Sequence, residues 1–216
     1  MKAVGLQLAL PSAIVAVVLS AGSVSATESS AVSKREVDAK ISYCQDCHGP
    51  QGQGYRGFYP IPRLAGQQPQ YIENQLRAFV ERRRPNPIMS NVAHVLRPGL
   101  MAALAAKFHS FNPRPLGGAP PGLAAKGENI FLNGVPEANV AACAACHGPE
   151  ATGVGEIPRL AGQLYPYIVR ELTYWSKERG QIPSKPDTSV IMAPVAHSLS
   201  RPQIEAVAAY LSTLRK

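Results

Sequence analysis

The sequence contains only four cysteines in 216 residues, and they form two Cys-x-x-Cys pairs, Cys44 with Cys47 and Cys143 with Cys146. Stretches in which apolar and polar residues alternate are also scarce. Because such alternation is typical of a half-buried strand, its scarcity argues against a sheet. We therefore expect an all-α fold in which the few thiols serve one specific purpose.

The apolar run near the N-terminus is shorter than the roughly 20 residues that a membrane-spanning helix needs. It follows a lysine, is interrupted by Pro11 and gives way to small residues that end at Ala26. This pattern is typical of a secretory signal peptide, so we expect residues 1–26 to be cleaved off near Ala26, with a membrane anchor as the alternative. Export would place the chain where paired cysteines ordinarily form disulfides.

The formal net charge is +8, and it falls to +7 without Lys2 of the expected signal peptide. The longest basic run, residues 82–84, is short and lacks interleaved aromatic residues, which argues against nucleic-acid binding. We interpret this run as a solvated helix end. The alternative is a local basic surface that speeds docking with an acidic partner.

The chain repeats itself. "IPRLAGQ" at 61–67 returns unchanged at 157–163, and "IMSNVAHVL" from Ile88 is echoed by "IMAPVAHSL" from Ile191. The offset between the copies changes along the chain, which indicates insertions and deletions in surface loops. We expect an N-terminal domain at 27–111, a proline- and glycine-rich linker at 112–122 and a C-terminal domain at 123–216.

Helical patterns occupy matching places in both copies. They include "EVDAKISYCQDC" and "GLAAKGENIFLN", "PQYIENQLRAFVERRR" and "YPYIVRELTYWSKERG", and "RPGLMAALAAKFHSF" and "SRPQIEAVAAYLSTLRK". In the last pair a proline stands near the expected helix start, where its missing N–H costs nothing. Each domain is predicted to be small and all-α.

Both cysteine pairs are followed directly by a histidine, His48 and His147, and Cys-x-x-Cys-His is the attachment sequence of a c-type haem. Two thiols on one helical turn can bond the two vinyl groups, and the next residue can present imidazole to the iron. A shared zinc site would separate its cysteine pairs by far more residues than is usual. A redox disulfide would be expected in a thioredoxin-like pattern of strands and helices, which is missing. We predict two covalently bound haem c groups.

Methionines in the repeated "IM...VAH.L" context are the preferred distal ligands. Met89 lies 41 residues after His48, and Met192 lies 45 residues after His147. Met101 aligns with Ile204 and is expected in the helix core. His94 and His197, five residues after each methionine, are the alternative ligands, although methionine already offers a soft, haem-compatible sulfur.

The pair of haem phrases, each followed by "PRLAGQ", an amphipathic helix, a methionine and a closing helix, resembles the dihaem cytochromes of the cytochrome c4 family. The resemblance covers nearly all of the mature chain. It implies two class I cytochrome c folds packed about a pseudo-two-fold axis, with haem propionates near the domain interface. It also implies that the carbonyls of Pro62 and Pro158 accept the proximal imidazole N–H. Arg63 and Arg159 are expected to be propionate partners, with solvent exposure as the alternative.

The resemblance further implies a periplasmic electron carrier that passes single electrons from a membrane donor complex to a terminal oxidase. A dedicated cytochrome subunit of a periplasmic dehydrogenase complex is the first alternative. A dihaem peroxidase-like enzyme is the second, disfavoured by the matched methionines and by the absence of extra sequence for a substrate pocket. Four propionates would offset part of the positive charge, which weakens the case for a membrane-bound state and leaves peripheral membrane association open.

Overall fold

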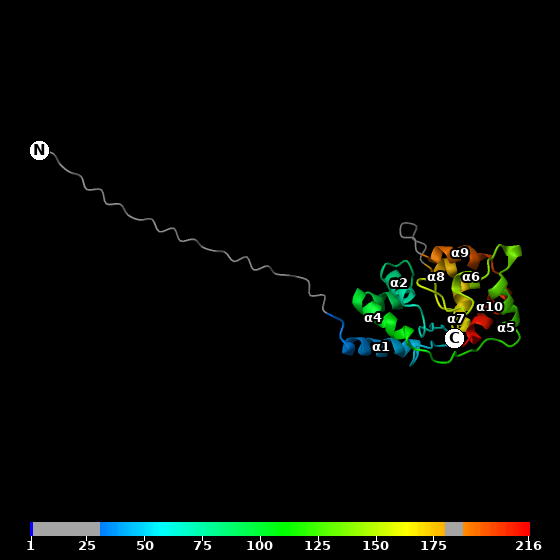
Figure 1. The fold of residues 1–216 in the computed structure, drawn as a ribbon, viewed down its shortest axis with the longest axis horizontal. Coiled ribbons are helices and arrows are strands. Elements are labelled where there is room, and N and C mark those ends of the chain that lie inside the picture. The colour runs from blue at the N-terminus through cyan, green and yellow to red at the C-terminus, as the bar shows by residue number, and fades with distance from the viewer. Residues whose placement is uncertain (2–30, 180–187) are drawn as a thin grey trace. The chain divides into compact units, whose positions relative to one another are not determined.

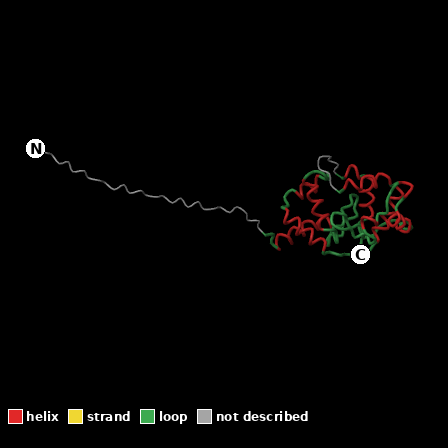
Figure 2. Tube along the Cα trace, turned by 45° about the horizontal axis from the view of Figure 1, so that its top comes forward, coloured by secondary structure: helices red, strands yellow, loops and turns green. Residues whose placement is uncertain are grey.

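The computed structural model describes residues 31–179 and 188–216, together with Met1. Helices joined by loops make up this part of the chain, and the only β pairing is three isolated bridges (Figure 2). None of the described helices is both long and apolar enough to cross a membrane. The expected signal peptide at 1–26 lies outside the described residues, apart from Met1.

The first repeat contains four helices. Ser33 caps the first of them by accepting a hydrogen bond from the N–H of Glu36 at 3.2 Å, and prolines open the other three. Three of the four helices lie where the sequence pattern predicts them, and α3 was not predicted. The helices are α1 (Lys34–His48), α2 (Pro69–Val80), α3 (Pro87–Ala93) and α4 (Pro98–His109).

The second repeat follows the same order with additional short elements, and residues 111–120 before it have no regular secondary structure. Figure 1 shows α5 beside α10, and these two helices pack closely. The elements are α5 (Ala124–Asn133), the 3₁₀ turn η1 (Pro136–Ala138), α6 (Ala144–His147), α7 (Tyr165–Thr173), α8 (Trp175–Glu178), α9 (Ser189–Ser198) and α10 (Arg201–Thr213).

Each repeat has its own apolar core. The first is built on α4, where Leu104 and Phe108 are each 2 % exposed, and the second on α5 and α10, where Phe131 is fully buried. Met101 and Ile204, the aligned pair expected in the helix core, are both buried. Two separate cores agree with a duplicated unit, although residues 31–216 form one compact body.

The repeats differ just before the cysteine phrase. Helix α1 runs through the first phrase to its histidine, whereas α5 ends at Asn133 and the second phrase falls on the short helix α6. The intervening loop is closed by the bridge between Val135 and Val140, and Asn139 adopts a left-handed φ of 53°. The position of the second cysteine phrase is therefore set by the packing of this loop as well as by the short helix α6.

Two glutamines join the repeats reciprocally. Gln163 accepts a hydrogen bond from the Arg63 N–H at 2.8 Å and donates to the Arg63 carbonyl at 3.0 Å. Gln67 makes the same pair with Arg159, at 2.7 Å from the N–H and 3.0 Å to the carbonyl. Because Gln67 and Gln163 are equivalent positions of the repeated phrase, the contact is isologous, as a pseudo-two-fold arrangement requires.

The interpretation of residues 82–84 as a solvated helix end was wrong for two of the three arginines, and with it the proposed docking surface. Arg83 is buried, and the Arg84 side chain is only 12 % exposed. After α2 the chain turns at Arg82, whose φ is 59°, and the Arg84 guanidinium then reaches α7, where it lies 2.7 Å from the Tyr167 hydroxyl and 3.1 Å from Glu171. Arg84 thus joins the basic run to the second repeat, and the position of α7 decides how far its side chain is buried.

Glu171 is the acidic centre of this contact. It also pairs with Arg179, while Gln75, its equivalent in the first repeat, accepts hydrogen bonds from both arginines at 2.9 and 2.6 Å. Burial opposes ionisation of Glu171, but Arg179 and Arg84 outweigh it and hold the pKa of the carboxyl below its usual range. One carboxylate therefore compensates two buried guanidinium groups.

Replacing Gly127 should destabilise the second repeat. A Cβ there would lie 1.9 Å from the carbonyl oxygen of Ala206, so α5 could no longer approach α10 as closely. We expect Gly127→Ala to lower the free energy of unfolding by about 1–3 kcal/mol, measured by denaturant titration. The matched control is Gly99→Ala on α4, where a Cβ would meet only the Val32 side chain at 3.3 Å. Equal losses in both variants would contradict the packing argument.

Replacing Glu171 should strip two buried arginines of their counter-charge. We expect Glu171→Gln to cost about 3–5 kcal/mol at neutral pH. Because the folded-state pKa of Glu171 is lowered, its stabilisation is present above the unfolded pKa and is lost as pH falls through the folded pKa. The variant should therefore lose part of the acid dependence of stability that the parent shows. Glu178→Gln, which affects the more exposed pair with Arg170, is the control and should cost less.

Candidate functional site

The two motif histidines lie in the same environment. His48 and His147 are 8 % and 5 % exposed, and each Nδ1 lies 2.9 Å from a backbone carbonyl, that of Pro62 or Pro158. Burial lowers the pKa of both imidazoles, and the hydrogen bond to the carbonyl opposes it only in part. A neutral ring that donates from Nδ1 leaves the Nε2 lone pair available to a metal.

The four cysteines are free thiols. Cys44 and Cys143 are partly buried, and Cys47 and Cys146 are exposed. In the chain before haem attachment, burial raises the pKa of Cys44 to about 11 and also raises that of Cys143, so both thiols are protonated at neutral pH. Each pair lies within the five residues that end at its histidine, so each repeat presents two thiols and one imidazole from the same short segment.

The expected distal methionines lie on equivalent helices, Met89 on α3 and Met192 on α9, and both are partly buried. Helix α3 packs on α2, and α9 packs on α7. The alternative ligands His94 and His197 are exposed, and the Nδ1 of His94 lies 2.8 Å from the Asn91 carbonyl. Burial thus favours the methionines.

Arg63 and Arg159 are buried, which rules out the solvent-exposed alternative. Each guanidinium donates to backbone carbonyls, Arg63 to Ala65 and Pro113, and Arg159 to Ala161 and Lys216. Neither makes an ion pair among the described residues, and Nη1 of Arg63 is buried without a hydrogen-bond partner. Burial and the nearby Arg159 lower the pKa of Arg63 to about 10.

These observations fit a haem in each repeat. Reduced cysteine pairs can form the thioethers, the oriented imidazoles can ligate iron, and two buried guanidinium groups without carboxylates call for anions such as propionates. By contrast, no group of three or more His, Cys, Asp or Glu side chains assembles in residues 31–179 and 188–216. The four thiols therefore do not form a shared zinc site.

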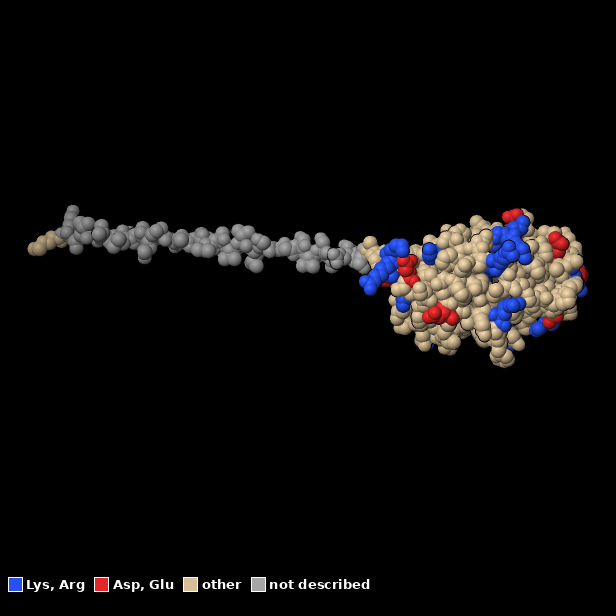
Figure 3. All heavy atoms as spheres, turned by 90° about the horizontal axis from the view of Figure 1, so that it is seen from below, with Lys and Arg blue, Asp and Glu red and all other residues tan. Residues whose placement is uncertain are grey.

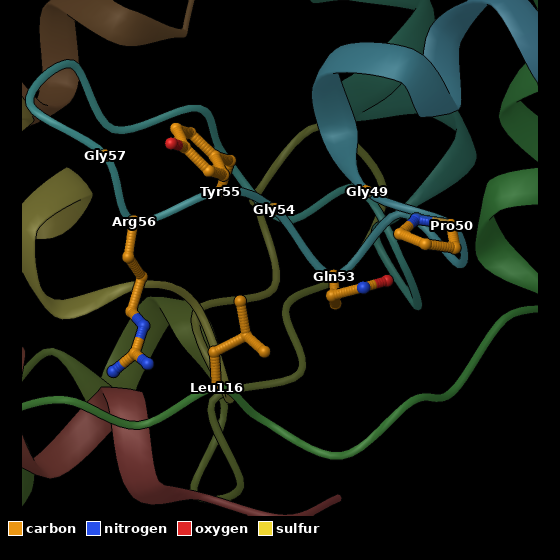
Figure 4. A pocket seen from close by; sticks show the side chains of 8 residues that line it. All are labelled: Gly49, Pro50, Gln53, Gly54, Tyr55, Arg56, Gly57 and Leu116. Carbon is orange, nitrogen blue, oxygen red and sulfur yellow. The ribbon is translucent and has the colours of Figure 1, made fainter.

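An open hollow of about 420 Å³ lies between the loop that follows the first cysteine phrase and the linker. In Figure 4 the side chains of Arg56 and Leu116 extend into the space between loop and linker, while the Tyr55 ring lies on the other side of the loop. Of the eight lining residues only Arg56 is charged, so this hollow contains no carboxylate or histidine that could act as a general base.

The surface in Figure 3 shows several separate groups of basic side chains with acidic ones among them, surrounded by neutral residues. On this face the positive charge is dispersed and forms no continuous stripe. The distribution there resembles an ordinary mixed-charge surface rather than a track for a nucleic-acid backbone.

The fold and the two sites define a c-type cytochrome with two covalently bound haems, and comparison with known proteins agrees. The cytochrome c family model matches residues 124–215. Cytochrome c4 of Thiocapsa roseopersicina is 40 % identical over 176 residues, which cover 79 % of this chain and 86 % of the relative. The chain belongs to the cytochrome c4 family, and it is a dihaem electron-transfer cytochrome.

Two further relatives extend the comparison. The solved cytochrome c4 of Acidithiobacillus ferrooxidans has a TM-score of 0.67 and 37 % sequence identity, covering 80 % of this chain and 99 % of that chain. A protein of Thiomonas intermedia named "Thiosulfate dehydrogenase electron acceptor" is 37 % identical, covering 78 % of this chain and 77 % of the relative. The all-α fold of tandem class I cytochrome c domains is thereby confirmed.

Sequence reasoning missed Gln67 and Gln163. Each closes the repeated "IPRLAGQ" phrase, so the signal was visible as a polar residue kept in both copies. Their role could not be assigned because each one bonds the opposite repeat. The docking of the repeats, rather than any local pattern, gives these side chains their partners.

Removing one methionine at a time tests the distal ligands. Met89→Ala and Met192→Ala should each open one iron, so that the reduced variant binds carbon monoxide at one haem of two, measured by optical titration. His94→Ala and His197→Ala are the controls and should leave both irons closed. Carbon monoxide binding in the histidine variants instead would reassign the ligands.

Proposed function

We propose that this protein carries single electrons in the periplasm between a respiratory donor and a terminal acceptor such as an oxidase. The observation that supports it most is the matched pair of sites, each with a buried imidazole oriented by a prolyl carbonyl and a methionine on the equivalent helix. If both irons are six-coordinate, no substrate reaches the metal, and the protein is a carrier rather than an enzyme.

The proposed ligand set follows the site residues. His48 with Met89 and His147 with Met192 would be the axial pairs, and the two cysteine pairs would provide the thioethers. A haem held in this way supplies a one-electron couple. The chain's own contribution is to fix the imidazole rings, to exclude water from them and to hold Arg63 and Arg159 as buried cations for propionates.

The domain division of the sequence analysis also stands as a proposal, with a signal peptide at 1–26, domains at 27–111 and 123–216 and a linker at 112–122. Its support is the presence of one apolar core in each repeat. Export through such a signal would account for the proposed periplasmic location.

A second candidate is a dedicated electron acceptor of a periplasmic dehydrogenase. It is favoured by the relative that is named "Thiosulfate dehydrogenase electron acceptor". Both candidates need the same haem chemistry, so they differ only in the donor.

Potentiometric titration of the full-length protein, combined with haem quantification, tests the carrier function. We expect two haems per chain and two one-electron steps at relatively high potential, because methionine ligation raises the potential. One haem or none would contradict the proposal.

Stopped-flow reduction distinguishes the donors. The oxidised protein is mixed with a thiosulfate dehydrogenase and thiosulfate, or with a reduced membrane donor complex. Fast reduction only by the first pair would favour the dedicated acceptor, and fast reduction by the membrane complex would favour the general carrier. Omission of thiosulfate is the control.

A further inference from the structure

Each proximal histidine is connected to the opposite repeat through a single peptide group. The peptide between Pro62 and Arg63 uses its carbonyl to hold His48 Nδ1 at 2.9 Å, and its N–H donates to the Gln163 side chain at 2.8 Å. The two hydrogen bonds are therefore made by opposite ends of the same amide.

The second site has the same construction. The peptide between Pro158 and Arg159 holds His147 Nδ1 at 2.9 Å through its carbonyl, and its N–H donates to the Gln67 side chain at 2.7 Å. Gln67 and Gln163 are 5 % and 7 % exposed, so bulk water does not compete for these contacts. The pattern thus crosses between the repeats in both directions.

Hydrogen bonds made by one amide reinforce each other. When the N–H of the peptide donates, electron density moves to the carbonyl oxygen, which becomes a stronger acceptor. A stronger acceptor pulls on the Nδ1 proton and makes the imidazole a more basic ligand. A more basic ligand stabilises ferric over ferrous iron and lowers the reduction potential.

The geometry points to Gln163 and Gln67 as positioning residues that tune the haem of the opposite repeat, Gln163 acting on the His48 site and Gln67 on the His147 site. This inference rests on the proposed axial roles of both histidines. It makes the interface between the repeats part of the redox tuning, because any separation of the repeats would weaken both carbonyl acceptors at once.

The chain offers a matched control. Gln68 also reaches across to the second repeat, where its amide donates to the carbonyls of Thr152 and Gly153 at 2.9 and 3.2 Å. Neither carbonyl belongs to a peptide that holds an imidazole, and the Gly153 N–H donates to the backbone carbonyl of His147 at 2.9 Å rather than to its ring. Gln68→Leu therefore removes hydrogen bonds between the repeats without touching either imidazole.

The test compares Gln163→Leu, Gln67→Leu and Gln68→Leu in the haem-loaded full-length protein. The potential of each haem is followed by NMR during a redox titration, with signals assigned to His48 and His147. Gln163→Leu should raise the potential of the His48 haem, and Gln67→Leu that of the His147 haem. Mutating a group that hydrogen-bonds a metal ligand changes metal affinity or activity by about 10–100-fold. The two glutamines act one bond further from the iron, so we expect each leucine variant to change the redox equilibrium constant of its haem by roughly threefold to tenfold. A tenfold change corresponds to about 59 mV for one electron.

If a leucine variant fails to fold, a second variant and a second measurement still test the inference. Gln163→Glu keeps an acceptor for the Arg63 N–H, and its carboxylate is a stronger one. In the reduced protein the Nδ1–H signal of His48 should then move while that of His147 stays. Movement of both signals together, or of neither, would overturn the inference.

The outcomes separate this inference from the proposed function. If the parent protein lacks two haems or either histidine ligand, the proposed function fails before any variant is compared. If the parent is as proposed and each leucine variant shifts both haems equally, shifts the haem of its own repeat, or shifts none, the cross-repeat tuning is wrong. A shift in Gln68→Leu as large as in the other two variants would contradict it as well.

Discussion

The hydrogen bond from a buried imidazole to a prolyl carbonyl is the contact on which both sites depend. It fixes the ring and its tautomer, so that Nε2 remains the free nitrogen on His48 and on His147. The loop that supplies the carbonyl is held in turn by a glutamine from the other repeat. The ligand geometry of one repeat is therefore linked to the docking of the two.

The interface between the repeats contains more buried positive than negative charge. Buried arginines outnumber buried carboxylates where the repeats meet, with Glu171 compensating Arg84 and Arg179 on one side. Arg63 and Arg159 have no acidic partner among the described residues, and they lie next to the peptides that hold the histidines. An excess of buried positive charge suits anionic propionates, and it would favour the ferrous state of a nearby iron.

Most of the fold followed from local patterns, because apolar periodicity and proline positions mark helices such as α2, α4 and α10. The family resemblance also predicted that the backbone carbonyls of Pro62 and Pro158 would orient the two imidazoles. Residues 82–84 were misinterpreted because local sequence cannot show that α7 lies next to Arg84. Gln67 and Gln163 were missed for the same reason, since their partners belong to the other repeat.

A crystal structure of the haem-loaded protein would test the central claim most directly. The account predicts two irons, each between histidine Nε2 and the methionine sulfur of the same repeat, with both imidazole Nδ1 atoms still bonded to Pro62 and Pro158. An iron with an open sixth position, one bound by His94 or His197, or an imidazole that donates elsewhere would contradict it.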